Sequence, residues 1–267
     1  MIWKNEFERI DFLIKRAVKE LFIELSKTDE YIHFLAFCDY DPSLEKTQVT
    51  PYIIDNRRDG FKDEAWLSTL MTFLNSSYRF NHENTSDSKV SIIFEMMMYL
   101  HIWESRPYLR FLKRISNLLD KNEYLWKPKI KDSSKTTILS TEILPVFEKK
   151  NLKIAEIIKC GYIKQIRDAI AHNEYYHNLY RPVIILENYK PNPQRINKLH
   201  YNEWTQLFCY SFLLAYHLRT FYEDYRHSID KDEGTQGIPA TLYNKKGNRV
   251  DGKIFYNSER NTFSAKY

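Results

Sequence analysis

Residues 203–225 read EWTQLFCYSFLLAYHLRTFYEDY, a long stretch without proline or glycine in this 267-residue chain. Leu207, Tyr210, Leu214 and Leu218 recur every three or four residues, the spacing that places apolar side chains on one face of an α-helix. Such a helix has to cover its apolar face with other elements. We therefore expect a last long helix that closes a helical bundle.

Other segments of the chain have the same helical periodicity. Residues 3–27 carry an apolar stripe formed by Phe7, Ile10, Ile14, Val18, Leu21 and Leu25. Residues 62–79 predict a second helix, and residues 90–103, VSIIFEMMMYLHIW, predict a third that is apolar on nearly every side and therefore central in the bundle. A fourth helix is expected to begin near Pro107, and a fifth to run over residues 141–161.

The C-terminal part of the chain has a different pattern. Residues 242–267, LYNKKGNRVDGKIFYNSERNTFSAKY, alternate apolar with polar positions and carry turn signals at Lys246-Gly247 and Asn257-Ser258. We expect an all-α, up-and-down helical bundle with insertions over residues 1–228, followed by a linker and a small β-meander over residues 229–267. Residues 180–189 predict either a short strand or an extended loop.

Several classes of protein are excluded by composition. The N-terminal residues MIWKNEFERID include acidic side chains and no apolar signal core, so no secretory segment is expected. The longest apolar runs, residues 91–103 and 204–218, are too short and too interrupted to span a membrane. The three cysteines, at positions 38, 160 and 209, show no CxxC spacing and indicate neither a disulfide framework nor a zinc site. We expect a cytoplasmic protein that needs no cofactor and no membrane.

Basic residues gather in two places. The net charge of +5 permits an anionic partner without requiring one. The predicted fourth helix carries Arg106, Arg110, Lys113 and Arg114 on one face, and the following segment carries Lys127, Lys129 and Lys131 beside Tyr124 and Trp126. Cations interleaved with aromatic rings hold single-stranded nucleic acid, with phosphates on the cations and bases on the rings. These residues are therefore candidate RNA contacts; the competing interpretation is a solvated helix face and a surface loop.

The hexapeptide RDAIAH places Arg167, Asp168 and His172 together at the end of a predicted helix. The same spacing occurs at Arg195 and His200, but there it follows two prolines rather than an apolar helical pattern. At 100° per residue, Arg167 and His172 lie about 140° apart on a helix. They converge on one phosphate only if the helix ends near His172 or if a second copy brings its own motif opposite.

Each residue of the motif has a chemical use in RNA cleavage. His172 titrates near neutral pH and can act as base, acid or both. Arg167 offers a planar fork of donors that fits a phosphate and stabilises charge on the phosphoryl oxygens. Asp168 can accept the ring proton of His172, or it can hold Arg167 in place.

The string YIKQIRDAIAHNEYYHN, residues 162–178, resembles the HEPN superfamily of small helical domains. That family's signature is an arginine, a polar residue beside it, and a histidine after four to six intervening residues; Arg167, Asp168 and His172 match it, and the similarity extends over residues 140–228. The resemblance implies a HEPN-like bundle and a metal-independent endoribonuclease that leaves 2′,3′-cyclic phosphate and 5′-hydroxyl ends. It also implies a toxin or antiphage defence effector, restrained by an antitoxin or regulatory partner.

The family further implies a homodimer whose two motifs face one another across the two-fold axis. The alternative, of a different class, is a non-catalytic HEPN module for dimerisation and RNA binding. Asn173, Tyr176 and His177 follow the motif and either contact RNA or form an exposed helix end. A metal site is not expected, because His172, Glu174 and His177 do not have the HExxH spacing of zinc ligands.

Overall fold

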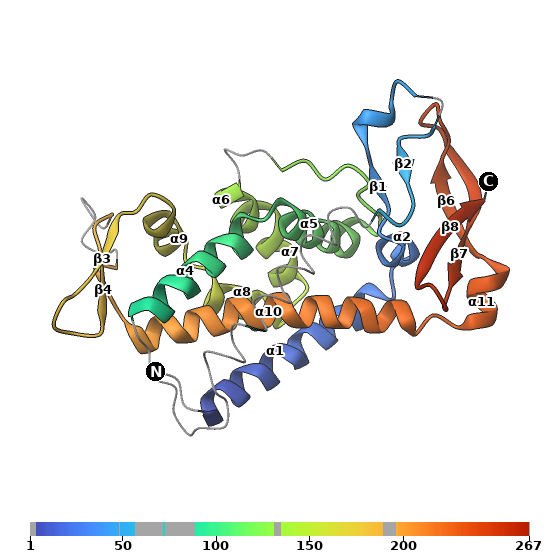
Figure 1. The fold of residues 1–267 in the computed structure, drawn as a ribbon. Helices are drawn as coiled ribbons and strands as arrows, with labels where there is room; N and C mark the ends of the chain where they lie inside the picture. Colours follow the sequence, from blue (N-terminus) through green and yellow to red (C-terminus); the bar gives the residue numbers. More distant parts are fainter. Residues whose placement is uncertain are drawn as a thin grey trace.

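The computed structural model describes residues 4–47, 49–56, 72, 89–130, 135–188 and 196–266. The longest helix, α10 (Tyr201–His227), runs along most of the molecule, and other elements are arranged around it (Figure 1). Two helices that pack against it come from distant parts of the sequence, α1 (Lys4–Leu25) and α4 (Lys89–Glu104). The expected last helix is thus confirmed, and the expected helix over residues 62–79 lies outside the described residues.

Further helices surround this framework. They are α2 (Tyr31–Leu35), α5 (Arg106–Lys121), α6 (Lys135–Ile138), the π-helical turn η3 (Leu139–Ile143), α7 (Leu144–Lys149), α8 (Ile154–Gly161), α9 (Lys164–Ala171) and α11 (Lys231–Gln236), with a short 3-10 helix η1 (Pro42–Leu44). The single helix expected over residues 141–161 is wrong. Asn151 adopts a left-handed conformation with φ 54°, which separates α7 from α8.

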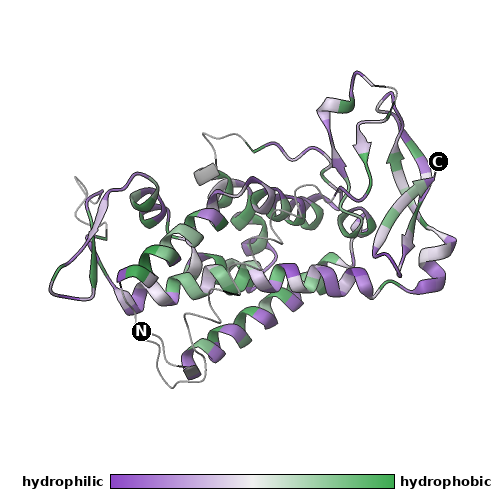
Figure 2. Ribbon diagram, in the orientation of Figure 1, coloured by the Kyte–Doolittle hydropathy of each residue, from purple (hydrophilic) through white to green (hydrophobic). Residues whose placement is uncertain are grey.

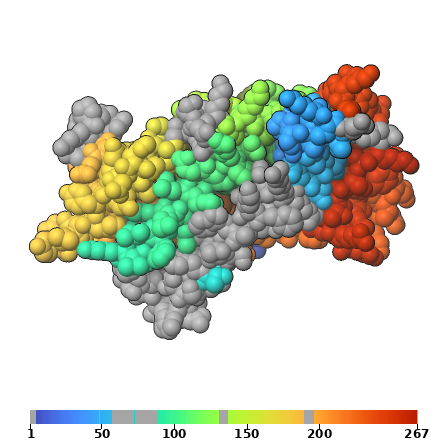
Figure 3. Space-filling model, turned by 45° about the horizontal axis from the view of Figure 1, so that its top comes forward, coloured from blue at the N-terminus to red at the C-terminus, as the bar shows by residue number. Residues whose placement is uncertain are grey.

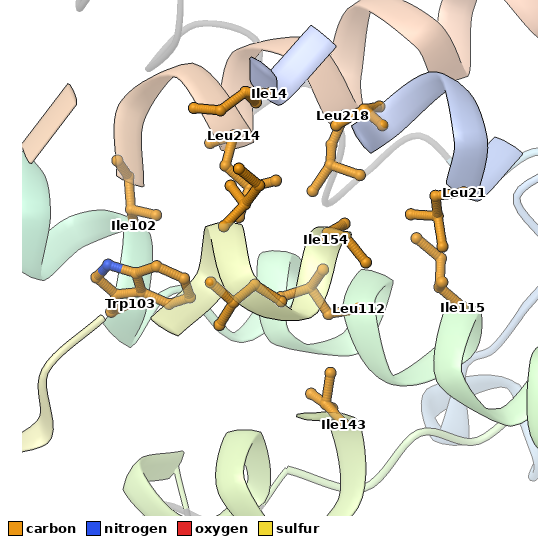
Figure 4. Packing of buried hydrophobic residues seen from close by; sticks show 14 of the residues in the cluster. Ile14, Leu21, Ile102, Trp103, Leu112, Ile115, Ile143, Ile154, Leu214 and Leu218 are labelled. Atoms are coloured by element: carbon orange, nitrogen blue, oxygen red, sulfur yellow. The ribbon is translucent and has the colours of Figure 1, made fainter. Parts of the chain in front are cut away.

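The buried side of α10 holds the core together. Leu214 and Leu218 lie among Ile14 and Leu21 of α1, Ile154 of α8, and Leu112 and Ile115 of α5 (Figure 4). Aliphatic side chains that interdigitate in this way remove apolar surface from water, the main favourable term in folding. Among the described residues, no helix is long and apolar enough to cross a membrane.

The expected all-α class is wrong. The chain is 57% helical and 16% strand, with three small antiparallel sheets, so it is a mixed α/β protein. One sheet pairs β1 (Asp39–Tyr40) with β2 (Tyr52–Ile53); the second has the order β3 (Tyr175–His177), β4 (Val183–Leu186), β5 (Lys198–His200). Strands of two to four residues are too short to show an alternating pattern in the sequence. Of the two interpretations of residues 180–189, the strand is correct for β4.

The third sheet is an antiparallel meander of β6 (Ile238–Tyr243), β7 (Arg249–Asn257) and β8 (Thr262–Lys266). Ile254 on the central strand pairs with Ile238 on one side and Ala265 on the other. Its buried side chains, Leu242, Ile254, Tyr256 and Phe263, belong to the same hydrophobic cluster as the helices. Within the expected linker, residues 231–236 form α11, which packs on β7.

Arg226 of α10 joins the meander to the helices. Its side chain is buried; Nη1 donates to the carbonyl oxygen of Leu35 at 2.9 Å, and Nη2 pairs with Asp55 at 3.1 Å and donates to the carbonyl oxygen of Asn261 at 3.0 Å. A buried cation is tolerated only when its donors are satisfied. The meander therefore completes the coordination of a charge that the helical body has already buried.

The helix α4 is apolar along much of its length (Figure 2). The expectation that it is central is wrong, because Val90 and Met97 are exposed on one face. Its opposite face carries Glu95, which is fully buried; Trp204 of α10 donates to Oε2 at 2.6 Å, and Oε1 has no hydrogen-bond partner among the described residues. Burial raises the pKa of Glu95 to about 8, although the Trp204 bond opposes this rise.

Glu95 predicts how stability depends on pH. The folded protein holds the Glu95 proton more tightly than the unfolded chain, where the pKa is near 4.5. The free energy of unfolding therefore falls as pH rises from about 4.5 to about 8. Glu95→Gln, which stays neutral, should flatten this dependence and stabilise the protein at pH 9 by roughly 2–4 kcal/mol. Urea unfolding across this range tests it; Glu259→Gln, an exposed control, should behave like the wild type, and equal slopes for all three proteins would contradict the expectation.

A close helix contact fixes the start of the segment that carries the RDAIAH motif. Gly161, the last residue of α8, lies against Ser211 of α10, whose hydroxyl donates to the Gly161 carbonyl oxygen. Trp103 Nε1 donates to the same hydroxyl at 3.0 Å. A Cβ atom at position 161 would lie 2.9 Å from the backbone nitrogen of Ser211, closer than real Cβ atoms approach. The two backbones can meet here only because residue 161 has no side chain.

Gly161→Ala should therefore destabilise the protein. The added methyl meets backbone that cannot move alone, and overpacking of this kind costs about 1–3 kcal/mol. The midpoint of urea unfolding measures the effect. Gly234→Ala is the matched control, since its Cβ would meet Tyr256 no closer than 3.1 Å and α11 gains helix propensity. The close contact would be disproved by equal midpoints for Gly161→Ala and the wild type.

Candidate functional site

The helix α9 is aligned by its apolar face and by a bond at its start. Ile166 and Ala169 are buried, and α9 packs against α4. The backbone N–H of Ile163, the residue before the helix, donates to the hydroxyl of Tyr99 on α4 at 3.2 Å. Arg167, next to Ile166, is thereby directed toward the C-terminal end of α4.

The helix ends where the chemistry of the motif requires. Asn173 has φ 56°, its N–H donates to the Ile170 carbonyl oxygen at 3.3 Å, and the N–H of Glu174 donates to that of Ala169 at 2.8 Å. This pattern of bonds is the Schellman motif, which terminates helices through a residue in the left-handed region. His172 is the last residue before this turn, and its side chain is exposed. Asn173, a candidate RNA contact, thus has a structural role as well.

Arg167 is held on several sides. Its side chain is 8% exposed, and Nη1 lies 3.1 Å from Oε1 of Glu104 on α4 and 3.0 Å from Oδ1 of Asp168. Burial raises the pKa of Tyr162, while the charge of Arg167 and its hydrogen bond to that hydroxyl oppose the rise. Nε of Arg167 is buried without a hydrogen-bond partner among the described residues. The guanidinium is therefore fixed in place with one donor still unused.

Asp168 holds Arg167 rather than His172. Its Oδ1 pairs with Arg167, and its Oδ2 accepts from Lys164, four residues earlier, at 2.7 Å. In the part of the chain that the structure describes, no hydrogen bond or ion pair joins the side chain of His172 to Asp168 or Arg167. Of the two roles expected for Asp168, the geometry favours the positioning of Arg167.

The residues after the motif belong to the β3–β4 hairpin. Tyr176 on β3 is 51% exposed, and His177 is half-buried with Nδ1 2.8 Å from the hydroxyl of Tyr201. Burial lowers the pKa of His177, and the charge of Lys89 lowers it further. Tyr176 is therefore available to a partner, whereas His177 contacts the start of α10.

The basic residues of α5 do not form one exposed stripe. Arg114 is 2% exposed and pairs with Asp39 at 2.6 Å, so its place among the candidate RNA contacts is corrected: it is an interior ion pair. Lys113 pairs with Glu142 at 2.9 Å. Arg106 is exposed and Arg110 half-buried. The helix turns Arg114 inward because Leu118 and Ile115, on the same side, are core residues.

The lysine-rich segment after α5 is only partly accessible. Lys127 and Lys129 are exposed, whereas Lys131 lies outside the described residues. Tyr124 and Trp126, expected to stack on bases, are 3% and 6% exposed, so their rings are core side chains. The sequence pattern identified the charges correctly as surface residues but not the environment of the rings.

Two residues of the site were not foreseen from the sequence. Glu104 lies 63 positions before Arg167, and Tyr162 lies at the start of the motif segment; neither carries a local signal of its role. Only the packing of α9 on α4 brings Glu104 to the guanidinium. No group of three or more His, Cys, Asp or Glu side chains that could hold a metal ion occurs among the described residues.

The site is thus a fixed guanidinium, two carboxylates that hold it, and an exposed imidazole at the end of the same helix. Comparison with protein-family models, curated proteins and solved structures finds no match for this chain, so its function has to be inferred from these residues.

Proposed function

We propose that this protein is a metal-independent endoribonuclease of HEPN type, which cleaves RNA to 2′,3′-cyclic phosphate and 5′-hydroxyl ends. The observation that carries the proposal is the arrangement on α9: Arg167 is fixed by Glu104 and Asp168, and His172 stands exposed where the helix ends. Positioned cations and an accessible imidazole are the groups that phosphodiester cleavage requires.

The chemistry needs no cofactor, because RNA carries its own nucleophile. His172 takes the proton of the 2′-hydroxyl, whose oxygen attacks the adjacent phosphorus. Arg167 stabilises the negative charge that builds on the phosphoryl oxygens. A proton then has to reach the departing 5′-oxygen. One imidazole per chain can supply it only in a second step, so a second copy of His172 opposite the first accounts for both proton transfers.

A homodimer brings two motifs together, because a two-fold interface places each residue opposite its own copy. The β3–β4 hairpin that follows the motif offers a surface for it: Leu179 is 76% exposed and Tyr180 92% exposed. The hairpin lies at the outer end of the molecule, next to α9 (Figure 1). We place the protein among toxins or antiphage defence effectors, restrained by an antitoxin or regulatory partner, on the basis of the HEPN resemblance.

The second candidate is a non-catalytic HEPN module for dimerisation and RNA binding. The observation that favours it is the burial of Arg167 between two carboxylates. These neutralise much of the guanidinium charge, and a phosphate has to compete with Glu104 for it. The two functions differ in whether RNA is cut.

The test of the first function is cleavage of mixed cellular RNA by the purified protein in excess chelator. The wild type should produce fragments with 2′,3′-cyclic phosphate ends, and His172→Ala should lower the rate at least a hundredfold, because general acid–base catalysis contributes about that much or more. Arg167→Lys keeps the charge but loses the planar fork and should also slow cleavage.

His227→Ala is the matched control, since His227 is also exposed but lies at the far end of α10. It should cleave like the wild type. Equal cleavage by the wild type and His172→Ala would reject His172 as a catalytic residue. RNA binding without cleavage by any protein would favour the binding module.

The dimer makes its own prediction. The double substitution Leu179→Ser and Tyr180→Ser removes two exposed apolar side chains and should convert a dimer into a monomer in analytical ultracentrifugation, with cleavage lowered at least tenfold. Phe12→Ser on α1, where Phe12 is 62% exposed, is the matched control and should stay dimeric. A wild type that sediments as a monomer while it cleaves RNA is incompatible with a shared site.

A further inference from the structure

We infer that the end of the molecule opposite α9 carries a second RNA-binding surface, which holds the RNA strand away from the cleavage site. This inference rests on RNA being the substrate, as proposed above. The surface, called here the tyrosine-lysine surface, consists of Tyr40, Tyr52, Tyr243, Lys127, Lys129, Lys245 and Lys246. These residues come from the β1–β2 sheet, the segment after α5, and the β6–β7 hairpin.

The tyrosines form a continuous aromatic group. Tyr52 and Tyr243 stack with ring centroids 4.3 Å apart and an interplanar angle of 12°. Tyr40 lies against Tyr52 at 5.0 Å. Trp126, which is buried, contacts Tyr52 and Tyr243 with its ring at 5.6 Å from each. The tyrosines are half-exposed over this tryptophan, so part of the aromatic group is open to solvent.

Lysines surround the aromatic group. Lys127 Nζ lies 3.5 Å from the ring centroid of Tyr40 and 5.0 Å from that of Tyr52. Lys127 and Lys129 are exposed on either side of Pro128, which is buried, so both lysines lie on the same face of the extended segment. This face therefore presents two cations next to the tyrosines.

The β6–β7 turn adds two more lysines. Asn244 fixes this turn: its side-chain oxygen accepts from the backbone N–H of Lys246 at 2.9 Å and from that of Asn248 at 3.1 Å. A Cβ atom built on Gly247 would lie 3.7 Å from the hydroxyl of Tyr52, which places the turn beside the tyrosines. Lys245 and Lys246 are both exposed.

These four lysines carry charge that the described protein does not neutralise. None of them has an ion pair with a described carboxylate, whereas Lys113, Lys149 and Lys159 of the helical body each have one. The neighbouring carboxylates are already engaged. Glu30 and Glu123 pair with Arg249 at 3.2 Å and 2.9 Å, and Glu45 accepts from the hydroxyl of Tyr40.

Cations next to exposed aromatic faces suit single-stranded RNA. Lysines neutralise phosphates, and bases stack on aromatic rings regardless of sequence, at about 1–3 kcal/mol per base. A membrane surface would need exposed apolar side chains to insert, and no residue of β6, β7 or β8 is among the exposed large apolar residues. The chemistry therefore favours RNA over an anionic lipid surface.

The distance between the two sites sets a length for the RNA. The residues of α9 and β3–β5 lie at one end of the molecule and the C-terminal sheet at the other (Figure 3). The helix α10 separates them; its 27 residues span about 40 Å. At about 3.4 Å per nucleotide, a strand needs roughly a dozen nucleotides to reach both. The surface should strengthen the binding of long RNA and leave the cleavage of a six-nucleotide RNA unchanged.

The test uses the triple variant Lys129→Ala, Lys245→Ala, Lys246→Ala in the full chain. Lys127 is kept because its Nζ packs on two rings. The matched control replaces three exposed lysines of the helical body, Lys15, Lys19 and Lys150, by alanine. Binding of a fluorescein-labelled 20-nucleotide single-stranded RNA is measured by anisotropy in excess chelator, with His172→Ala added to each protein to prevent cleavage. Unchanged thermal midpoints show that the variants fold.

The triple variant should raise the Kd for the 20-nucleotide RNA at least tenfold, and the slope of log Kd against log salt should fall by about 2, since each lost phosphate contact on a single strand removes about 0.7. The control triple should bind like the parent. Replacement of the same three lysines by arginine should preserve binding, because charge is retained. Without the His172 change, the triple variant should raise KM for the long RNA and leave kcat, and cleavage of the six-nucleotide RNA, unchanged.

The outcomes separate this inference from the proposed function. Cleavage by the wild type together with equal RNA binding by both triple variants overturns the inference and leaves the nuclease in place. Weakened binding by the first triple variant alone, with no cleavage by the wild type, supports the inference and rejects the nuclease. Loss of binding to phosphatidylserine vesicles with RNA binding unchanged assigns the surface to lipid and also overturns the inference.

Discussion

The burial of α10 on several sides is the constraint on which the rest of the structure depends. Trp204, Leu214 and Leu218 are all buried, and they meet different neighbours. A helix with one apolar stripe needs one partner, but a helix buried on several sides needs a shell of elements. The chain supplies α1, α4 and α8 for this purpose, from segments far apart in the sequence. The places of α9 and of the C-terminal sheet follow from that shell.

The candidate site is a product of this arrangement. Gly161 lets α8 end against α10, and the chain then turns through Tyr162 into α9, whose apolar face packs on α4. Glu104 is thereby brought to Arg167 without any sequence signal linking the two. A guanidinium fixed between carboxylates keeps one geometry, which is useful for positioning a phosphate but reduces the charge available to attract it.

The sequence predicted local features well and tertiary ones poorly. The periodicity of Leu207, Leu214 and Leu218 correctly predicted a long helix, and the alternation after residue 242 predicted the C-terminal meander. The all-α class was wrong because strands as short as β1 and β3 leave no pattern to detect. Arg114 was misplaced because a basic residue on an amphipathic helix looks exposed until its partner, Asp39, is known to lie inside. The environment of His172, by contrast, was foreseen, since the end of a helix is a local property.

The coordination of Arg226 also constrains the order in which the chain can fold during synthesis. Two of its partners, Asp55 and Leu35, leave the ribosome early, but Asn261 and Phe263 follow Arg226 by more than thirty residues. Until those residues emerge, the guanidinium has no carbonyl oxygen of Asn261 and no ring of Phe263 over it, and Asp55 lacks the backbone N–H of Phe263. An incomplete nascent chain therefore lacks part of its core, and the native state forms only after the β7–β8 hairpin has been translated.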